Sequence, residues 1–317
     1  MRSLFVMDPL DRIDVRTDST WMLMRACRAR GWPVHACEPR DLKLDGQGPG
    51  ATARPVEVRD TAPHLEPGPL VRQTLAAWDV VWMRKDPPFD EDFYFALLLL
   101  DRARPGTLVV NDPASMVLGN EKLLALRFPG LFTDTVVAAD PALLGEAVRA
   151  YGDAVLKPWN GCGGRGVLLT SSGDPNLPAL LELLTDRGRH HAIVQRRLPG
   201  AVRGDKRVLL VEGEPRGWLL RVPGPGDHRA NLHVGGRATP CDLDDRDRAI
   251  CETVGPALKE AGLLFVGLDI IDGTLSEINV TSPTGIQEAD RFLGVHIEDE
   301  ILDAVARRAG IPTGDIP

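Results

Sequence analysis

Short apolar runs alternate with amphipathic stretches along the first third of the chain. The apolar runs predict strands at residues 3–7, 33–37, 79–83 and 108–110, and the amphipathic stretches predict helices at 19–30 and 91–102. Asp18 or Ser19 would cap the first helix. This order indicates a small doubly wound α/β sheet over residues 1 to about 112. Residues 46–69 are rich in Gly, Pro and Ala, so we expect a surface excursion there.

From residue 120 the pattern changes to short strands separated by Gly-rich turns. The predicted strands are residues 154–157, 167–171, 192–195, 207–211 and 216–221. They indicate an α+β region. Residues 298–308 open with acids and close with arginines before Gly310, which predicts a terminal helix whose role is packing.

Residues 267–280 form an apolar hairpin pattern that carries Asp269, Glu277 and Asn279. A strict two-residue turn would set Asp269 and Glu277 on opposite faces, whereas a longer loop or a bulge would set them opposite each other. We expect the second register. Glu277 and Asn279 share a face, and three hard oxygen donors in one patch suit Mg²⁺. The alternative is a polar, solvated face, which is disfavoured because unpaired buried carboxylates are costly.

The composition is that of an ordinary globular protein, with 43% hydrophobic and 26% charged residues among 317. A chain of this length exceeds what one core comfortably serves, so we expect two or three packed subdomains. The net charge of −8 argues against nucleic acid or an anionic membrane as the main partner. Anionic small molecules can still meet local clusters of Arg and Lys.

The five cysteines are odd in number and show no Cys-x-x-Cys spacing. Neither a disulfide framework nor a cysteine-based zinc site is indicated, which fits a reducing cytoplasm. The longest apolar run, near residues 95–100, is too short to span a membrane, and the N-terminus has no signal-peptide pattern.

Residues 161–166, Gly-Cys-Gly-Gly-Arg-Gly, match the G-x-G-x-x-G spacing of dinucleotide sites. That fingerprint must open a helix, but strand-like residues follow here, so the unit is strand, glycine loop, strand. Such a loop can cover phosphates with its backbone N–H groups, the alternative being a plain flexible turn. Lys157, at the end of the entering strand, favours the phosphate cover.

Only six of the 37 basic residues are lysine, and three of them, Lys122, Lys157 and Lys206, stand in contexts that suit a phosphate contact. Arg207 and Arg221 add planar donors for a carboxylate or a transferring phosphoryl group.

Two further segments have open interpretations. Residues 195–198 are either an adenine-facing hinge or simply a strand end. Residues 223–237 indicate a mobile lid that would exclude water, and its His228 and His233 are more typical of polar surface than of general bases.

Six segments together resemble prokaryotic glutathione synthetases, in order from near the start to about residue 306. They are Val6-Met7-Asp8-Pro9, residues 83–90, Asn120-Glu121-Lys122-Leu123, Leu156-Lys157-Pro158, Gly204-Asp205-Lys206-Arg207 and residues 277–284. The resemblance implies an ATP-grasp fold with an N-terminal Rossmann-like domain. The expected units are a substrate-side domain at 1–120, a lid subdomain with the glycine loop at 121–190 and a C-terminal subdomain with the metal site at 191–317.

The resemblance also implies site residues. ATP would contact Lys122, Lys157, the loop glycines Gly161, Gly163, Gly164 and Gly166, and the hinge from Gln195 to Leu198. Glu277 and Asn279 would bind Mg²⁺, with Mn²⁺ as an alternative, and Asp269 would be an additional ligand. The dipeptide would lie among Asp8, Asp18, Ser19, Arg84 and Asp86, although capping is an alternative role for Asp18 and Ser19.

The implied reaction is ATP-dependent ligation of γ-L-glutamyl-L-cysteine and glycine through an acyl phosphate, with Arg207 and Arg221 stabilising the developing charge. Two alternatives are another ATP-grasp carboxylate–amine ligase and a catalytically silent ATP-binding module. The second is disfavoured by the retained transfer residues. Family resemblance further implies a cytoplasmic homo-oligomer, namely a tetramer, with small molecules as its partners.

Overall fold

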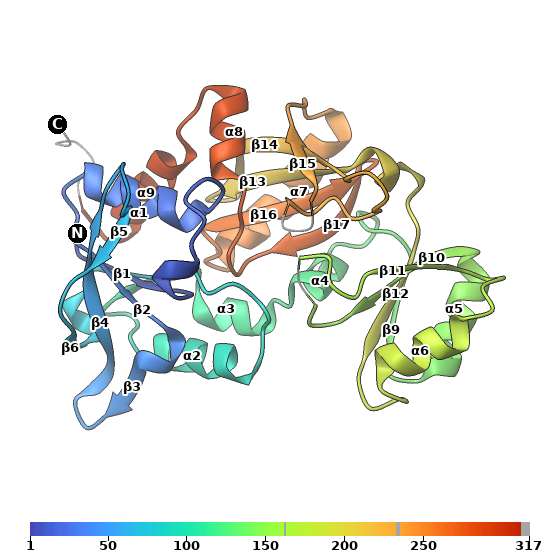
Figure 1. The fold of residues 1–317 in the computed structure, drawn as a ribbon, viewed down its shortest axis with the longest axis horizontal. Helices are drawn as coiled ribbons and strands as arrows, with labels where there is room; N and C mark the ends of the chain where they lie inside the picture. The colour runs from blue at the N-terminus through green and yellow to red at the C-terminus, as the bar shows by residue number, and fades with distance from the viewer. Residues whose placement is uncertain (162, 233–234, 312–317) are drawn as a thin grey trace.

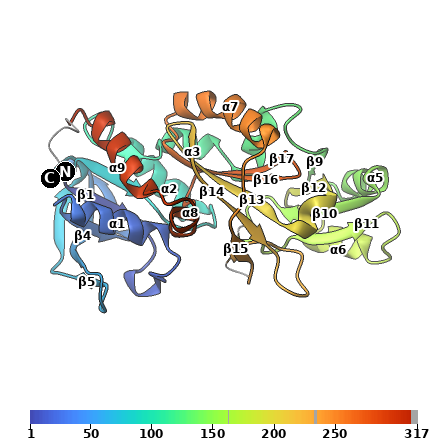
Figure 2. The same cartoon turned by 90° about the horizontal axis from the view of Figure 1, so that it is seen from above.

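The computed structural model describes residues 1–161, 163–232 and 235–311, which build three sheets (Figure 1). The C-terminal sheet lies between the N-terminal sheet and the sheet built from the middle of the chain, in both views (Figures 1 and 2). No helix in the described ranges has the length and apolar character needed to cross a membrane.

The N-terminal sheet has a parallel centre in the order β2-β1-β7-β8. Its elements are β1 (Ser3–Val6), β2 (Val34–Cys37), β7 (Val80–Met83), β8 (Leu108–Val110), α1 (Ser19–Ala29) and α2 (Glu91–Asp101). Each was predicted to within one or two residues. Strand β1 is an apolar run because it is buried on both faces, as central parallel strands are.

The surface excursion predicted at residues 46–69 is wrong. The segment instead forms an antiparallel extension of the sheet, with β4 (Gly48–Val58) paired to β2, β3 (Leu42–Asp45), β5 (Leu65–Pro67) and β6 (Val71–Thr74). Ala51, Ala53, Val56 and Val58 are buried. Small alanines at alternate positions satisfy the two-residue period of a strand, but a count of Gly, Pro and Ala hides it.

The middle of the chain forms an antiparallel sheet in the order β11-β10-β12-β9. Its strands are β9 (Thr135–Ala138), β10 (Asp153–Pro158), β11 (Leu168–Ser171) and β12 (Ala192–Arg196), and the helices α5 (Pro141–Tyr151) and α6 (Leu177–Thr185) pack on them (Figure 1). The lid subdomain was expected to end at residue 190. Strand β12 follows that boundary but pairs with β10 and β9, so the middle sheet extends to residue 196.

The third sheet has the order β15-β14-β13-β16-β17. Its strands are β13 (Asp205–Val211), β14 (Glu214–Val222), β15 (Arg237–Thr239), β16 (Phe265–Ile271) and β17 (Thr274–Asn279). Along β13, Val208 packs with the core on the side of α7 (Asp245–Glu260), whereas Leu209 packs on the side of α8 (Ile286–Leu293) and α9 (Ile297–Arg308). Both faces are therefore covered. The terminal helix is confirmed, and it packs on α1.

Short elements complete the chain. They are α3 (Pro113–Leu118), α4 (Glu121–Leu124) and the 3-10 turns η1 (Leu10–Arg12), η2 (Pro39–Asp41), η3 (Leu75–Ala77), η4 (Ala125–Arg127) and η5 (Pro199–Arg203). Buried Asn111, just after β8, links the first and third sheets: its amide donates to Phe265 O at 2.7 Å and Val280 O at 2.9 Å, and accepts from Phe265 N at 2.9 Å. A fully satisfied buried amide holds the two sheets in one arrangement.

Candidate active site

A cavity of about 420 Å³ lies between the middle sheet and the third sheet. This volume is within the range of roughly 300–1,000 Å³ that is usual for small-molecule sites. The residues predicted to contact nucleotide that line it are Lys122, Lys157, Gly161, Gly163, Gly164, Gln195 and Leu198. Gly166 is not part of the lining, although its neighbours Arg165 and Val167 are.

The hairpin of β16 and β17 brings Asp269 and Glu277 into this cavity. The turn has only two residues, but the register shifts after Asp269, so that Ile270 pairs with Leu275 and Asp269 pairs with Glu277. One extra residue in β17 therefore restores the two carboxylates to one face. The expected register is confirmed, and it is the bulge that produces it.

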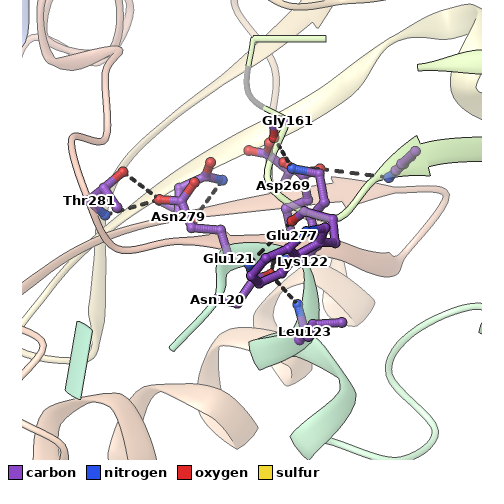
Figure 3. A network of polar contacts seen from close by, with 12 residues as sticks. Asn120, Glu121, Lys122, Leu123, Gly161, Asp269, Glu277, Asn279 and Thr281 are labelled. Carbon is purple, nitrogen blue, oxygen red and sulfur yellow. Dashed lines mark hydrogen bonds and ion pairs between the residues drawn. The ribbon is translucent and has the colours of Figure 1, made fainter. Parts of the chain in front are cut away.

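Two ammonium groups face Glu277. Its Oε1 is 3.7 Å from Lys157 Nζ and 3.9 Å from Lys122 Nζ, and Lys122 also donates to the carbonyl of Gly161 (Figure 3). Burial lowers the pKa of Lys157. Because both ion-pair distances exceed a hydrogen bond, each ammonium group keeps donors for an anion in the cavity.

Lys122 is positioned by its neighbours on α4. Asn120 Oδ1 caps this helix by accepting from the N–H groups of Lys122 and Leu123, at 3.1 and 3.2 Å. Glu121 Oε1 accepts from Val280 N and Thr281 N, both at 3.0 Å, and from Thr281 Oγ1 at 2.7 Å (Figure 3).

Glu121 therefore locks α4 to the end of β17, and burial raises the pKa of its carboxyl group. In the sequence, Glu121 stands within the Asn120–Leu123 segment, and no role was predicted for it. The one signal in the sequence was that Glu121 is an acid beside Lys122, a candidate phosphate ligand. The backbone partners of Glu121 lie 159 and 160 residues further along the chain.

The glycine loop and the segment after β14 contact each other over the cavity. Arg229 donates to the carbonyl of Gly164 at 3.3 Å, and a ring nitrogen of His228 lies 3.2 Å from the carbonyl oxygen of Val167. A Cβ atom on Gly164, where φ is +76°, would lie 2.8 Å from Asn231 Oδ1. Glycine is thus required at position 164 by both its backbone and its neighbour.

Between β14 and β15 the described residues of the predicted lid, 223–232 and 235–236, contain no strand or α-helix. His228, interpreted as polar surface, is exposed, and it also lines the cavity. His233 and Cys162 lie outside the described residues.

Arg207 and Arg221 both bind Asp269 beneath the cavity. Asp269 Oδ1 is 2.7 Å from Arg207 Nε, its Oδ2 is 2.8 Å from Arg221 NH2, and Arg221 Nε is 2.5 Å from Asp205 Oδ1. Burial alone would raise the pKa of Asp269, but the two guanidinium groups lower it well below its usual range. Asp269 is therefore ionised, and it fixes both arginines in place.

Asn279 and Lys206 do not line the cavity. The Asn279 amide donates to Gly267 O at 3.2 Å, which leaves its oxygen as the remaining acceptor. Lys206 pairs with Asp247 and, at 3.2 Å, with Asp244 at the start of α7. Side chains alternate along a strand, so Lys206 lies on the face opposite Arg207 and outside the lining of the cavity where its phosphate contact was predicted.

A second cavity, of about 190 Å³, contains four of the predicted dipeptide residues, Asp8, Asp18, Arg84 and Asp86. Arg84 is buried and donates to Thr20 Oγ1 at 3.1 Å and to Pro283 O at 3.0 Å. Desolvation lowers the pKa of the buried Arg84 and raises the pKa of Asp86, whose residue as a whole is exposed. This cavity therefore combines a fixed guanidinium with several carboxyl groups.

Asp18 has the capping role that was considered for it, whereas Ser19 does not cap α1. Asp18 caps α1 by accepting from Thr20 N at 2.5 Å and Trp21 N at 3.1 Å. Ser19 is fully buried, does not line the second cavity, and accepts from Gly285 N at 3.2 Å and Ile286 N at 3.3 Å.

Comparison with known proteins agrees with this arrangement. The N-terminal domain of prokaryotic glutathione synthetase matches residues 1–116, and the ATP-grasp domain of the same family matches residues 121–294. Proteins named glutathione synthetase from Prochlorococcus marinus (strain MIT 9313) and Pseudomonas putida (strain KT2440) are 46% and 43% identical. The alignments cover 95% and 96% of this chain and 97% and 96% of those proteins.

Solved structures with low identity support the fold. D-cycloserine synthetase DcsG has a TM-score of 0.66 at 17% identity, covering 97% of this chain and 99% of that one. The ATP-grasp ligase PsnB has a TM-score of 0.62 at 18% identity, again over 97% and 99%. The fold is that of ATP-grasp ligases, and the chain belongs to the prokaryotic glutathione synthetase family.

Proposed function

We propose that this ATP-dependent ligase joins γ-L-glutamyl-L-cysteine to glycine, giving glutathione, ADP and phosphate. The observation that carries the proposal is the convergence of Lys122, Lys157, the glycine loop and the Asp269–Glu277 pair on one cavity. First, the γ-phosphorus would move from the bridging oxygen of ATP to an oxygen of the cysteinyl carboxylate. The glycine amine would then add to the acyl carbon, and phosphate would leave as the amide forms.

The nucleotide side of the reaction would rest on charge and backbone donors. Lys122 and Lys157 bind the phosphates, and the glycine loop covers the phosphates. The hinge from Gln195 to Leu198 faces the adenine. Buried ammonium groups act on a phosphate more strongly than exposed ones, since the surroundings screen them less. Lys157 is 8% exposed and Lys122 is 9% exposed.

The oxygen donors fit Mg²⁺, which prefers carboxylates and phosphate oxygens. Glu277 and Asn279 would hold it, and Asp269 would be a further ligand through lone pairs that its arginines do not use. Two carboxylates paired on one face repel each other, and a cation relieves that repulsion. When bound, the ion would neutralise charge on the phosphate oxygens; Mn²⁺ suits the same donors.

Arg207 and Arg221 would stabilise the negative charge that develops during acyl transfer. Asp269 fixes both guanidinium groups, and Arg207 also donates to Thr284 O at 3.1 Å. Donors that are already oriented need no reorganisation during the reaction, which is the main advantage of such sites.

The dipeptide would occupy the second cavity, where Arg84 meets its carboxylate and Asp8, Asp18 and Asp86 meet its ammonium group. Ser19 would act on this cavity indirectly, because its hydroxyl group holds the backbone at Gly285 and Ile286.

Phosphate release measured with ATP and Mg²⁺ tests the function. γ-Glutamylcysteine and glycine are added separately and then together. Release only with both supports the proposal. Release with other acceptors supports another carboxylate–amine ligase, and no release with any acceptor supports a silent binding module.

By family resemblance we also propose that the enzyme is a cytoplasmic tetramer. Light scattering across a range of protein concentrations would test the assembly, and a constant monomer mass would refute it.

A further inference from the structure

Three ligand-type side chains meet around the turn between α8 and α9, and none of them lines either cavity. Asp290, His296 and Glu298 each offer one oxygen or nitrogen atom, and these atoms lie within 4.8 Å of one another. His296 Nδ1 is 3.8 Å from Glu298 Oε1. Neither the family resemblance nor the proposed reaction uses any of these residues.

Unmet hydrogen-bonding capacity distinguishes this cluster from a surface patch of acids. Glu298 is only 7% exposed, and its Oε2 has no hydrogen-bond partner among the described residues. The Oδ2 atom of Asp290 also lacks one, while Asp290 Oδ1 accepts from Ile297 N at 3.0 Å. Two neighbouring carboxyl groups without a donor between them require a proton or a cation.

We propose that Asp290, His296 and Glu298 bind a divalent transition-metal ion such as Zn²⁺. Imidazole with carboxylates suits Zn²⁺ and its neighbours, whereas Mg²⁺ prefers oxygen ligands alone. In a tetrahedral site with bonds of about 2.1 Å, ligand atoms are about 3.4 Å apart. The 3.8 Å between His296 Nδ1 and Glu298 Oε1 is close to this value, and the other pairs, within 4.8 Å, must contract by at most about 1.4 Å. The His296 side chain is 77% exposed, which gives the ion and its water ligand a path from solvent.

The bound ion would link the end of α8 to the first turn of α9. Helix α8 begins directly after Gly285, in the segment that Ser19 holds beside Arg84. The site is thus structural: it fixes the far end of a helix whose near end adjoins the second cavity.

Zinc titration of the full chain tests this proposal. The protein is treated with chelator, exchanged into buffer without nucleotide at pH about 8, and titrated with Zn²⁺ by calorimetry, with melting temperature as a second readout. The variants are His296→Ala and Asp290→Asn. The matched control is His190→Ala, because His190 is also exposed and lies 3.7 Å from a carboxylate oxygen of Asp186.

We expect about one equivalent of Zn²⁺ to bind and to raise the melting temperature. Affinity should fall at least tenfold, which is about 1.4 kcal/mol, in His296→Ala and Asp290→Asn. It should be unchanged in His190→Ala. Cobalt substitution adds a spectroscopic test, since the visible bands of bound Co²⁺ should disappear with His296→Ala.

Two results would overturn the proposal. One is Zn²⁺ binding that persists in both His296→Ala and Asp290→Asn. The other is a melting temperature that responds to pH but not to Zn²⁺. That result would mean that a proton shared by Asp290 and Glu298, not a metal ion, occupies the site, since burial and Glu298 raise the pKa of Asp290 to about 8. Circular dichroism of each variant shows whether it is folded before titration.

Discussion

Glu121 provides a quantitative test of how the site is held together. Replacing it with alanine removes the acceptor for the N–H groups of Val280 and Thr281, each at 3.0 Å, and for the Thr281 hydroxyl group at 2.7 Å. A buried donor left without a partner costs about 1–3 kcal/mol, so the two amides together should cost about 2–6 kcal/mol. Glu121→Gln keeps an acceptor oxygen and loses only the charge, which should cost about 1 kcal/mol.

Urea unfolding measures both losses, and calorimetric titration with Mg²⁺–ATP measures the second consequence. Because Lys122 follows Glu121 on α4, we expect Glu121→Ala to bind ATP more weakly as well. The matched control is Glu91→Ala: Glu91 is also the first residue of a helix but is exposed. If Glu121→Ala were no less stable than Glu91→Ala, or Glu121→Gln as unstable as Glu121→Ala, the reasoning would be refuted.

Three further substitutions test other parts of the structure. Gly164→Ala should weaken ATP binding more than Gly163→Ala. Both glycines have positive φ, but only at position 164 would a Cβ atom meet the 223–237 segment, so equal effects in ATP titrations would contradict the contact. Lys206→Ala should leave the KM for ATP unchanged and cost about 1–3 kcal/mol in urea unfolding, because the buried carboxylate of Asp247 loses its ammonium partner. Lys157→Ala should raise that KM, and a raised KM in Lys206→Ala would show that Lys206 reaches the nucleotide. Desolvation raises the pKa of Asp86, so the folded state binds the Asp86 proton more tightly than the unfolded state does. The stability that Asp86 contributes is therefore present below its unfolded pKa and is lost as pH rises through its folded pKa. Melting curves of Asp86→Asn should therefore depend less on pH than those of the unchanged chain, and parallel dependences would exclude the shift.

Local patterns predicted most of the elements, because strand and helix periods are written in neighbouring residues. The miss at residues 46–69 came from composition, which outweighed the alternation of Ala51 and Ala53. The opposite faces of Lys206 and Arg207 follow from the same two-residue period and were open to prediction. The partners of Glu121 were not, because they are brought near only when β17 lies beside α4.

The hairpin register shows where local reasoning reaches its limit. The Asp-Gly turn predicts two strands, but turn length alone would separate Asp269 from Glu277, and only the preference for gathering the oxygen donors of one metal site favoured a bulge. That preference is a tertiary effect: it depends on lysines from α4 and β10 that face Glu277 and on arginines from β13 and β14 that face Asp269.

Under the proposed function, Asp269 would serve both the scaffold and the reaction. If the carboxylate were lost, Arg207 would remain as an uncompensated buried charge and Arg221 would keep only Asp205 as its partner. Removing one partner of a buried ion pair typically costs about 3–5 kcal/mol. A ligand to Mg²⁺ and an anchor for Arg207 and Arg221 need not be separate roles, since the carboxylate has more lone pairs than the guanidinium groups occupy. The same oxygens would then set the distance between the Mg²⁺ ion at the phosphates and the two arginines. Such a fixed distance requires Asp269, Arg207 and Arg221 to lie side by side, and they stand on three adjacent strands of one sheet.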